Sequence, residues 1–155
     1  MELHRAGDLA KAGAVYREVL AEDPRQADAL HLLGVVAFQQ GPLREAIARI
    51  EAAIAINPAP AAYHSNLGNA LRRSGNHAAA IACYDAALAR DPNLVAARMS
   101  RAMSHHATSA FAAAITDYEA ALAAFPDNAD VCNNLAAALL AAGRPSEALA
   151  RLDGL

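Results

Sequence analysis

Two asparagines at corresponding places in the sequence carry its clearest chemistry. Asn66 and Asn134 are separated by twice 34 residues. A side-chain amide has two donor hydrogens and an acceptor oxygen, so it can pair with the backbone of a peptide without reading its side chains. Pairing with the backbone of a ligand is therefore one role open to these two amides. The alternative is that both amides pair with neighbouring helix groups or face water.

Catalytic and metal-binding patterns are not recognisable. We find no nucleophile with a base, no carboxylate pair and no phosphate-binding glycine loop, so we expect that the chain is not an enzyme and needs no cofactor. Cys83 and Cys132 lack metal-site spacing and are expected to be small core residues. Adjacent helical residues such as His105 and His106 point about 100° apart, so we expect no metal there.

Composition and charge exclude further classes. Ala, Leu, Glu and Arg dominate while aromatic residues make up 5%, which predicts an all-α protein. A net charge of −3 and a pI near 6.0 argue against a nucleic-acid partner, whose phosphates require a basic face. No run of about 18 apolar residues and no apolar signal core is present, so we expect no membrane contact and a cytoplasmic location.

Proline and glycine recur at an interval of 34 residues, which indicates a repeat architecture. The chain has only seven prolines, and four of them share one phase: Pro24, Pro58, Pro92 and Pro126. The glycines follow the same step, with a serine in the one slot that lacks glycine: Gly7, Gly41, Gly75, Ser109 and Gly143.

Each period is predicted to hold two helices of about 13 or 14 residues. In residues 27–60, apolar side chains follow helical spacing on both sides of Gly41-Pro42, and Asn57-Pro58 ends the second helix. Small residues recur at one position of each helix and predict a close approach of the paired backbones: Gly34, Gly68, Ala102 and Ala136 in the first helix, and Ala46, Ala80, Ala114 and Ala148 in the second.

This pattern, with Leu-Gly in the first helix, Ala and an aromatic residue in the second and Pro at the end, resembles the tetratricopeptide repeat (TPR). The resemblance covers the chain as a single array over 1–155, with partial repeats at 1–26 and 129–155 and full repeats at 27–60, 61–94 and 95–128. It implies a right-handed superhelical α-solenoid of antiparallel helix pairs. The third repeat diverges most, with Arg98, Arg101 and His105 where the family mostly has apolar or aromatic residues.

The resemblance also implies where a ligand binds. In this family the first helices line a concave groove that takes an extended peptide or a partner helix. Carried onto this sequence, the groove residues are Asp28, His31, Leu32, Val35 and Phe38; Ser65, Asn66, Asn69, Arg72 and Arg73; Met99, Ser100, Met103 and His106; and Asp130, Asn133, Asn134 and Ala137.

Two finer features of this groove are testable against the residues. Ser65–Leu71 is similar to repeats of O-linked N-acetylglucosamine transferase-type bacterial proteins, in which asparagine ladders hold a peptide backbone, although Leu32 and Ser100 interrupt the ladder here. Some members of the family bind a C-terminal carboxylate with lysine and arginine side chains on their first helices. Such a clamp is not expected here, because these cations are absent whether the motif starts at the first or at the second full repeat. Six basic side chains form a second candidate site: Arg72, Arg73, Arg98, Arg101, His105 and His106. They are expected either to bind an acidic partner segment or to stay solvated, and in the second case Arg101 pairs with Asp117 or Glu119.

The resulting hypothesis is a protein-interaction scaffold that binds a peptide or partner helix. The alternative is the substrate-selecting arm of a larger glycosyltransferase, since the sequence starts midway through a predicted first helix and stops within a second, as a segment of a longer array would. A minor alternative is end-to-end self-association through uncapped ends that expose Leu3, Ala6, Leu152 and Leu155.

Overall fold

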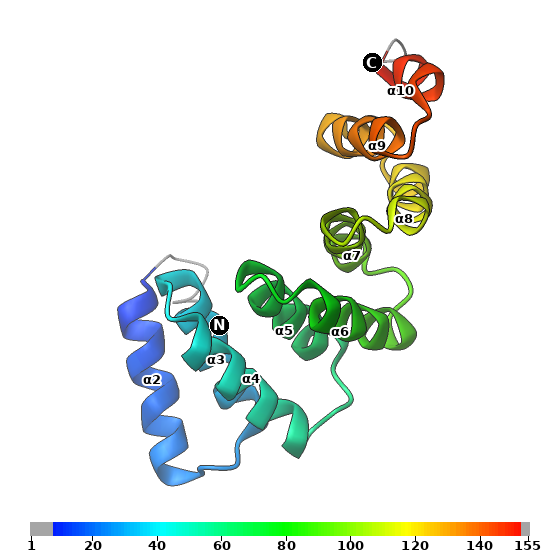
Figure 1. Cartoon of the computed structure of the whole chain (residues 1–155). Helices are drawn as coiled ribbons and strands as arrows, with labels where there is room; N and C mark the ends of the chain where they lie inside the picture. The colour runs from blue at the N-terminus through cyan, green and yellow to red at the C-terminus, as the bar shows by residue number, and fades with distance from the viewer. Residues whose placement is uncertain (1–7, 153–155) are drawn as a thin grey trace. The chain divides into compact units, whose positions relative to one another are not determined.

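The computed structural model describes residues 8–152, and every regular element among them is an α-helix. The chain divides into two compact units, Met1–Asn76 and His77–Leu155. The boundary lies between α5 and α6, inside the predicted repeat 61–94. The all-α prediction is confirmed, and so is the prediction of successive helix pairs (Figure 1).

The first unit contains α2 (Leu9–Glu22), α3 (Ala27–Gln40), α4 (Leu43–Ile56) and α5 (Ala61–Arg73). Each of these helices packs against the next along the chain, and α3 also contacts α5. We call α3, α5, α7 and α9 the A helices and α2, α4, α6, α8 and α10 the B helices. The contact between α3 and α5 therefore joins two successive A helices.

The second unit contains α6 (His77–Arg90), α7 (Val95–Ala107), α8 (Phe111–Ala124), α9 (Ala129–Ala141) and α10 (Pro145–Leu152). Neighbours along the chain again pack together, and the A helix α7 contacts the A helix α9. Apart from the eight residues of α10, the helices have 13 or 14 residues, as the sequence predicts.

Small residues bring α3 and α4 into close contact. A Cβ atom built on Gly34 would lie 2.6 Å from Ile50 Cγ1 and 3.1 Å from the carbonyl oxygen of Ala46. Neither Ala46 nor Ile50 has any exposed surface. The predicted close approach at Gly34 and Ala46 is thus confirmed, because a side chain on Gly34 would collide with Ile50 and press on the backbone of α4.

The second unit builds its core from the corresponding positions. Ala102 and Ala114 are fully buried, and Ala136 and Ala148 are 3% and 1% exposed. All four belong to one apolar cluster with larger side chains that fill the space between the helices, among them Ile115, Tyr118, Leu135 and Leu139.

The phased prolines mark loops with a shared side-chain cap. Asp23, Asn57 and Asp91 each precede a proline, and each Oδ1 accepts a hydrogen bond from the backbone N–H two residues on, at 3.0, 3.2 and 3.0 Å. Such Asx turns stop the B helix and leave the proline to lead into the next A helix. The fourth loop has Phe125 at this place, and this residue is 56% exposed.

A second shared contact anchors the same loops and explains one divergent residue. In α5 the His64 Nε2–H donates to the carbonyl oxygen of Pro58 at 2.9 Å. In α7 the corresponding residue is Arg98, whose Nη2 donates to the carbonyl oxygen of Pro92, also at 2.9 Å. The arginine therefore keeps the loop contact that the histidine makes one repeat earlier.

The turns after α5, α7 and α9 share one hydrogen-bond pattern. The backbone N–H of Asn76, Ala110 and Arg144 donates to the carbonyl five residues back, at 2.9, 2.8 and 2.9 Å. The preceding residue is left-handed in each case: Gly75 at φ 85°, Ser109 at φ 60° and Gly143 at φ 76°. Ser109 is the only residue other than glycine with positive φ in the described part of the chain.

Replacing Ser109 by glycine should stabilise the fold. A Cβ in the left-handed region costs roughly 1–2 kcal/mol, and the greater freedom of glycine in the unfolded chain offsets about 0.5–1 kcal/mol of that gain. We expect Ser109→Gly to raise the free energy of unfolding by about 0.5–1 kcal/mol, measured by urea denaturation with circular dichroism. The matched control Gly143→Ser should lower it by a similar amount, and a destabilised Ser109→Gly would contradict this account of the turn.

Candidate functional site

The first candidate surface is the α3–α5 face, the side on which these two A helices meet. Residues 35 apart in the sequence contact each other across it, in three pairs: Asp28 with Tyr63, His31 with Asn66, and Phe38 with Arg73. The pairs run from the first turn of α3 to its last, so the face is an ordered strip of acidic, aromatic, amide and cationic groups.

His31 and Asn66, both predicted as ligand-contacting residues, bind each other. The Nδ2 of Asn66 lies 2.9 Å from Nε2 of His31. Because an amide nitrogen can only donate, the ring nitrogen is the acceptor and the Asn66 oxygen points elsewhere. His31 is 7% exposed and stacks on Tyr63 with ring centroids 4.3 Å apart. The alternative use of these asparagines, pairing with a neighbouring helix, therefore holds for the nitrogen of Asn66.

Tyr63 fixes the start of the strip. Its hydroxyl donates a hydrogen bond to Oδ1 of Asp28. Burial raises the pKa of the Tyr63 hydroxyl well above its ordinary value, and the bond to the Asp28 carboxylate raises it further. The hydroxyl therefore stays protonated and remains the donor of this pair.

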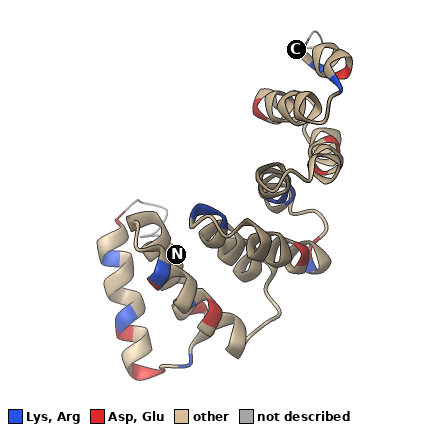
Figure 2. Ribbon diagram, viewed as in Figure 1, with Lys and Arg blue, Asp and Glu red and all other residues tan. Residues whose placement is uncertain are grey.

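Arg73 covers Phe38 at the other end of the strip. Its Nη1 donates to the carbonyl oxygen of Phe38 at 2.9 Å, and its guanidinium carbon lies 5.1 Å from the centre of the Phe38 ring. Arg72 precedes it in the last turn of α5, and Figure 2 shows this end of the helix in blue, the colour of Lys and Arg. The Nε of Arg72 is buried and has no hydrogen-bond partner.

The remaining predicted residues of this face differ in their availability. Val35 and Asn69 are half-buried, so part of each side chain is open to a ligand. Ser65 is 8% exposed and is the least available of the set.

The second candidate surface is the α7–α9 face. It contains a hollow of about 150 Å³, lined by Met103, His106, Tyr118, Asn134 and Ala137. The structure thus brings together four predicted groove residues around one concavity: Met103, His106, Asn134 and Ala137. Of the others, Met99 packs partly buried against the apolar cluster of this unit, and Asn133 is exposed.

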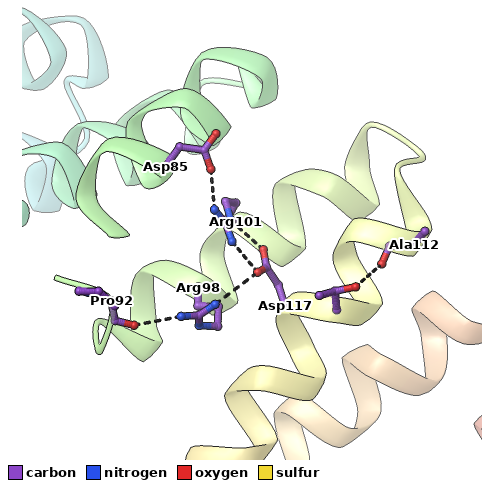
Figure 3. A network of polar contacts seen from close by, with 7 residues as sticks. Asp85, Pro92, Arg98, Arg101, Ala112 and Asp117 are labelled. Carbon is purple, nitrogen blue, oxygen red and sulfur yellow. Dashed lines mark hydrogen bonds and ion pairs between the residues drawn. The ribbon is translucent and has the colours of Figure 1, made fainter. Parts of the chain in front are cut away.

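Arg98 and Arg101 of the third repeat form an ion cluster around the buried Asp117. Arg101 donates from Nε and Nη2 to both carboxylate oxygens of Asp117, at 2.8 and 2.7 Å, and from Nη1 to Asp85 at 2.6 Å (Figure 3). Arg98 Nη1 lies 3.9 Å from the same Asp117 carboxylate. The bidentate bond to Asp117 raises the pKa of Arg101 above its ordinary value. The predicted pairing with Asp117 is confirmed, and it occupies the guanidinium that an acidic partner would need.

Metal binding, membrane spanning and self-association concern other parts of the described chain. In residues 8–152 no group of three or more His, Cys, Asp or Glu side chains is placed to hold a metal ion. None of the helices described is long and apolar enough to cross a membrane. Of the residues predicted for self-association, Leu152 is 41% exposed, whereas Leu3, Ala6 and Leu155 lie outside the described residues.

Comparison with protein families decides the assignment. A model of the tetratricopeptide repeat matches residues 2–59, 31–95 and 65–129, and a second model of the same repeat matches residues 105–155. The chain belongs to the tetratricopeptide repeat family. Its helix pairs are TPR motifs, and the resemblance drawn from the prolines and glycines is confirmed.

Solved TPR structures share the fold. A crystal structure of MamA superposes with a TM-score of 0.90 at 22% identity, over 98% of this chain and 89% of that chain. A crystal structure of YrrB, described as a TPR protein with an unusual peptide-binding site, gives a TM-score of 0.87 at 22% identity, over 97% and 78% of the two chains. A TPR protein from Parabacteroides merdae gives 0.77 at 16% identity, over 98% and 59%. A comparison with curated protein sequences gives no match.

The TPR period explains which residues the sequence prediction missed. Repeat positions are 34 apart, but the residues that touch across the α3–α5 face are 35 apart. A search at that spacing would have placed Tyr63 opposite Asp28. Tyr118 was missed because it belongs to the B helix α8, which the family pattern assigns to packing, although its ring also lines the hollow.

The ion cluster yields a stability prediction. One repeat earlier, the positions of Arg101 and Asp117 hold Leu67 and Cys83. Removing one member of a buried ion pair leaves a desolvated charge, whereas replacing both by apolar residues is often neutral. We expect Arg101→Leu to lower the free energy of unfolding by about 3 kcal/mol, and Arg101→Leu with Asp117→Cys to recover most of this loss in urea denaturation under reducing conditions. A double variant no more stable than Arg101→Leu alone would contradict this account of the ion pair.

Proposed function

We propose that this TPR chain is a protein-interaction scaffold and that its α3–α5 and α7–α9 faces bind an extended peptide or a partner helix. The observation that carries the proposal is the set of three contacts across α3 and α5. They hold aromatic, amide and cationic groups in fixed positions along one strip, so a ligand meets side chains that are already ordered. Preordered side chains lower the entropic cost of binding.

The strip also suggests what its ligand contributes. Half-buried Val35 and Phe38 offer apolar contact along α3, and the cations Arg72 and Arg73 end α5. A peptide with apolar residues and a carbonyl or carboxylate near Arg72 matches this order of groups.

The comparisons support the proposal at the level of the fold. The YrrB structure is described as having a peptide-binding site, and its fold matches this chain over most of its length. The sequence of Ser65–Leu71, which resembles O-linked N-acetylglucosamine transferase-type repeats, suggests a contact between asparagine and the ligand backbone. In this chain Asn134 is better placed for that contact than Asn66, whose nitrogen is already bound to His31.

A charge placed on the strip should weaken binding. Peptides can be selected from a displayed random library on the wild-type chain and their dissociation constants measured by fluorescence anisotropy. We expect Val35→Glu to weaken the selected peptides more than tenfold, because a carboxylate replaces an apolar contact in the middle of the strip and must be desolvated by the ligand.

Ala48→Glu is the matched control, since it adds the same charge at an exposed position of the B helix α4. It should change the affinity less than twofold, and circular dichroism should show both variants folded. Equal effects of the two substitutions, or a library that yields no binding peptide, would contradict the proposed function.

A further inference from the structure

The hollow on the α7–α9 face combines a buried aromatic ring with partly exposed polar side chains. Tyr118, at 2% exposure, is its most deeply buried lining residue, while Met103 is 40% exposed. Asn134 and His106 are half-buried beside it, and the His106 ring is held edge-on against Phe111 with centroids 5.4 Å apart.

The lining favours an uncharged apolar group. None of its five residues is Asp, Glu, Lys or Arg, and Met103, Tyr118 and Ala137 offer a thioether, a ring and a methyl group. A charged group entering this space would lose water without meeting a side chain of permanent opposite charge. A cavity near 150 Å³ holds a group the size of benzene, so one leucine-sized or phenyl-sized side chain fits. Methionine adapts its shape to such groups.

The amide of Asn134 supplies the polar contact beside the hollow. No residue of the described chain forms a hydrogen bond with this side chain, in contrast to Asn66, whose nitrogen is bound to His31. Both donor hydrogens and the acceptor oxygen of Asn134 therefore remain for a ligand. An amide with both functions matches the N–H and C=O of a peptide group.

We propose that this hollow is the anchor subsite of the chain: it takes one uncharged apolar side chain of an extended peptide while Asn134 pairs with the backbone of the same peptide. The inference rests on the proposed function and adds the residue class that the ligand places here. The hollow binds the side chain of the peptide, and Asn134 binds its backbone.

The smallest molecule with both features is N-acetylleucine N-methylamide, a leucine side chain between two peptide groups. The chain has three methionines, so a sample with ¹³C-labelled methionine methyl groups gives few signals, and Met103 can be assigned by substitution. We expect the probe to shift the Met103 methyl and the Asn134 side-chain amide with one shared saturation curve. The glycine and aspartate analogues should bind at least tenfold more weakly.

Variants on α9 separate the two parts of the subsite. Ala137→Leu fills the hollow and should abolish the saturable shift, whereas Ala141→Leu, one turn further along the same helix, should leave it unchanged. Asn134→Ala keeps the hollow and should weaken the leucine probe about fivefold through the lost hydrogen bonds. An unshifted Met103 methyl, equal binding of the glycine probe, tighter binding of the aspartate probe, or full binding by Ala137→Leu would overturn the proposal.

These outcomes are separable from a failure of the proposed function. Selected peptides that depend on Val35 but tolerate Ala137→Leu would refute only the anchor subsite. A leucine probe that binds in the hollow, together with peptides unaffected by Val35→Glu, would uphold the anchor and refute the role of the α3–α5 face.

Discussion

The close approach of α3 and α4 at Gly34 is the contact from which the first unit is built. With a missing side chain on one helix and Ala46 on the other, Ile50 fills the space between them and the two backbones come near each other. The alanines in the cluster of the second unit occupy the corresponding positions. Because this packing takes one side of an A helix, its remaining surface is left for the next A helix and for a ligand. Helices of 13 or 14 residues would be marginal alone, so their order depends on these contacts.

Contact between successive A helices then decides which polar groups a ligand can use. On the α3–α5 face, Tyr63 is committed to Asp28 and the nitrogen of Asn66 to His31, which makes the strip rigid but partly self-satisfied. On the α7–α9 face, Asn134 keeps its whole amide beside the hollow. Two asparagines at corresponding repeat positions therefore have different capacities, because residue 31 is a histidine that accepts from one of them. The repeat therefore sets where an asparagine lies, and the neighbouring A helix determines how many of its hydrogen-bonding groups a ligand can use.

Much of the fold followed from the sequence, because prolines, glycines and small residues act locally. The loops at Asp23, Asn57 and Asp91 and the turn at Gly75 need only their own few residues to form, so a 34-residue interval locates them. The pairing of Arg101 with Asp117 was also within reach, although the contribution of Asp85 from α6 was not. What the period could not predict were contacts across neighbouring A helices, which fall at 35 residues and depend on how the helices are offset. Tyr63 and the floor of the hollow at Tyr118 emerged only with the packed helices.

The central claim is that the ligand lies on the α3–α5 face or the α7–α9 face. A crystal structure of the chain with a library-selected peptide tests it most directly. The account predicts peptide electron density along Val35 and Asn69 on the α3–α5 face, or along the α7–α9 face with an apolar side chain inside the hollow and backbone atoms within hydrogen-bond distance of Asn134. Peptide density along the exposed sides of the B helices α4 or α8, with both A-helix faces empty, would contradict it.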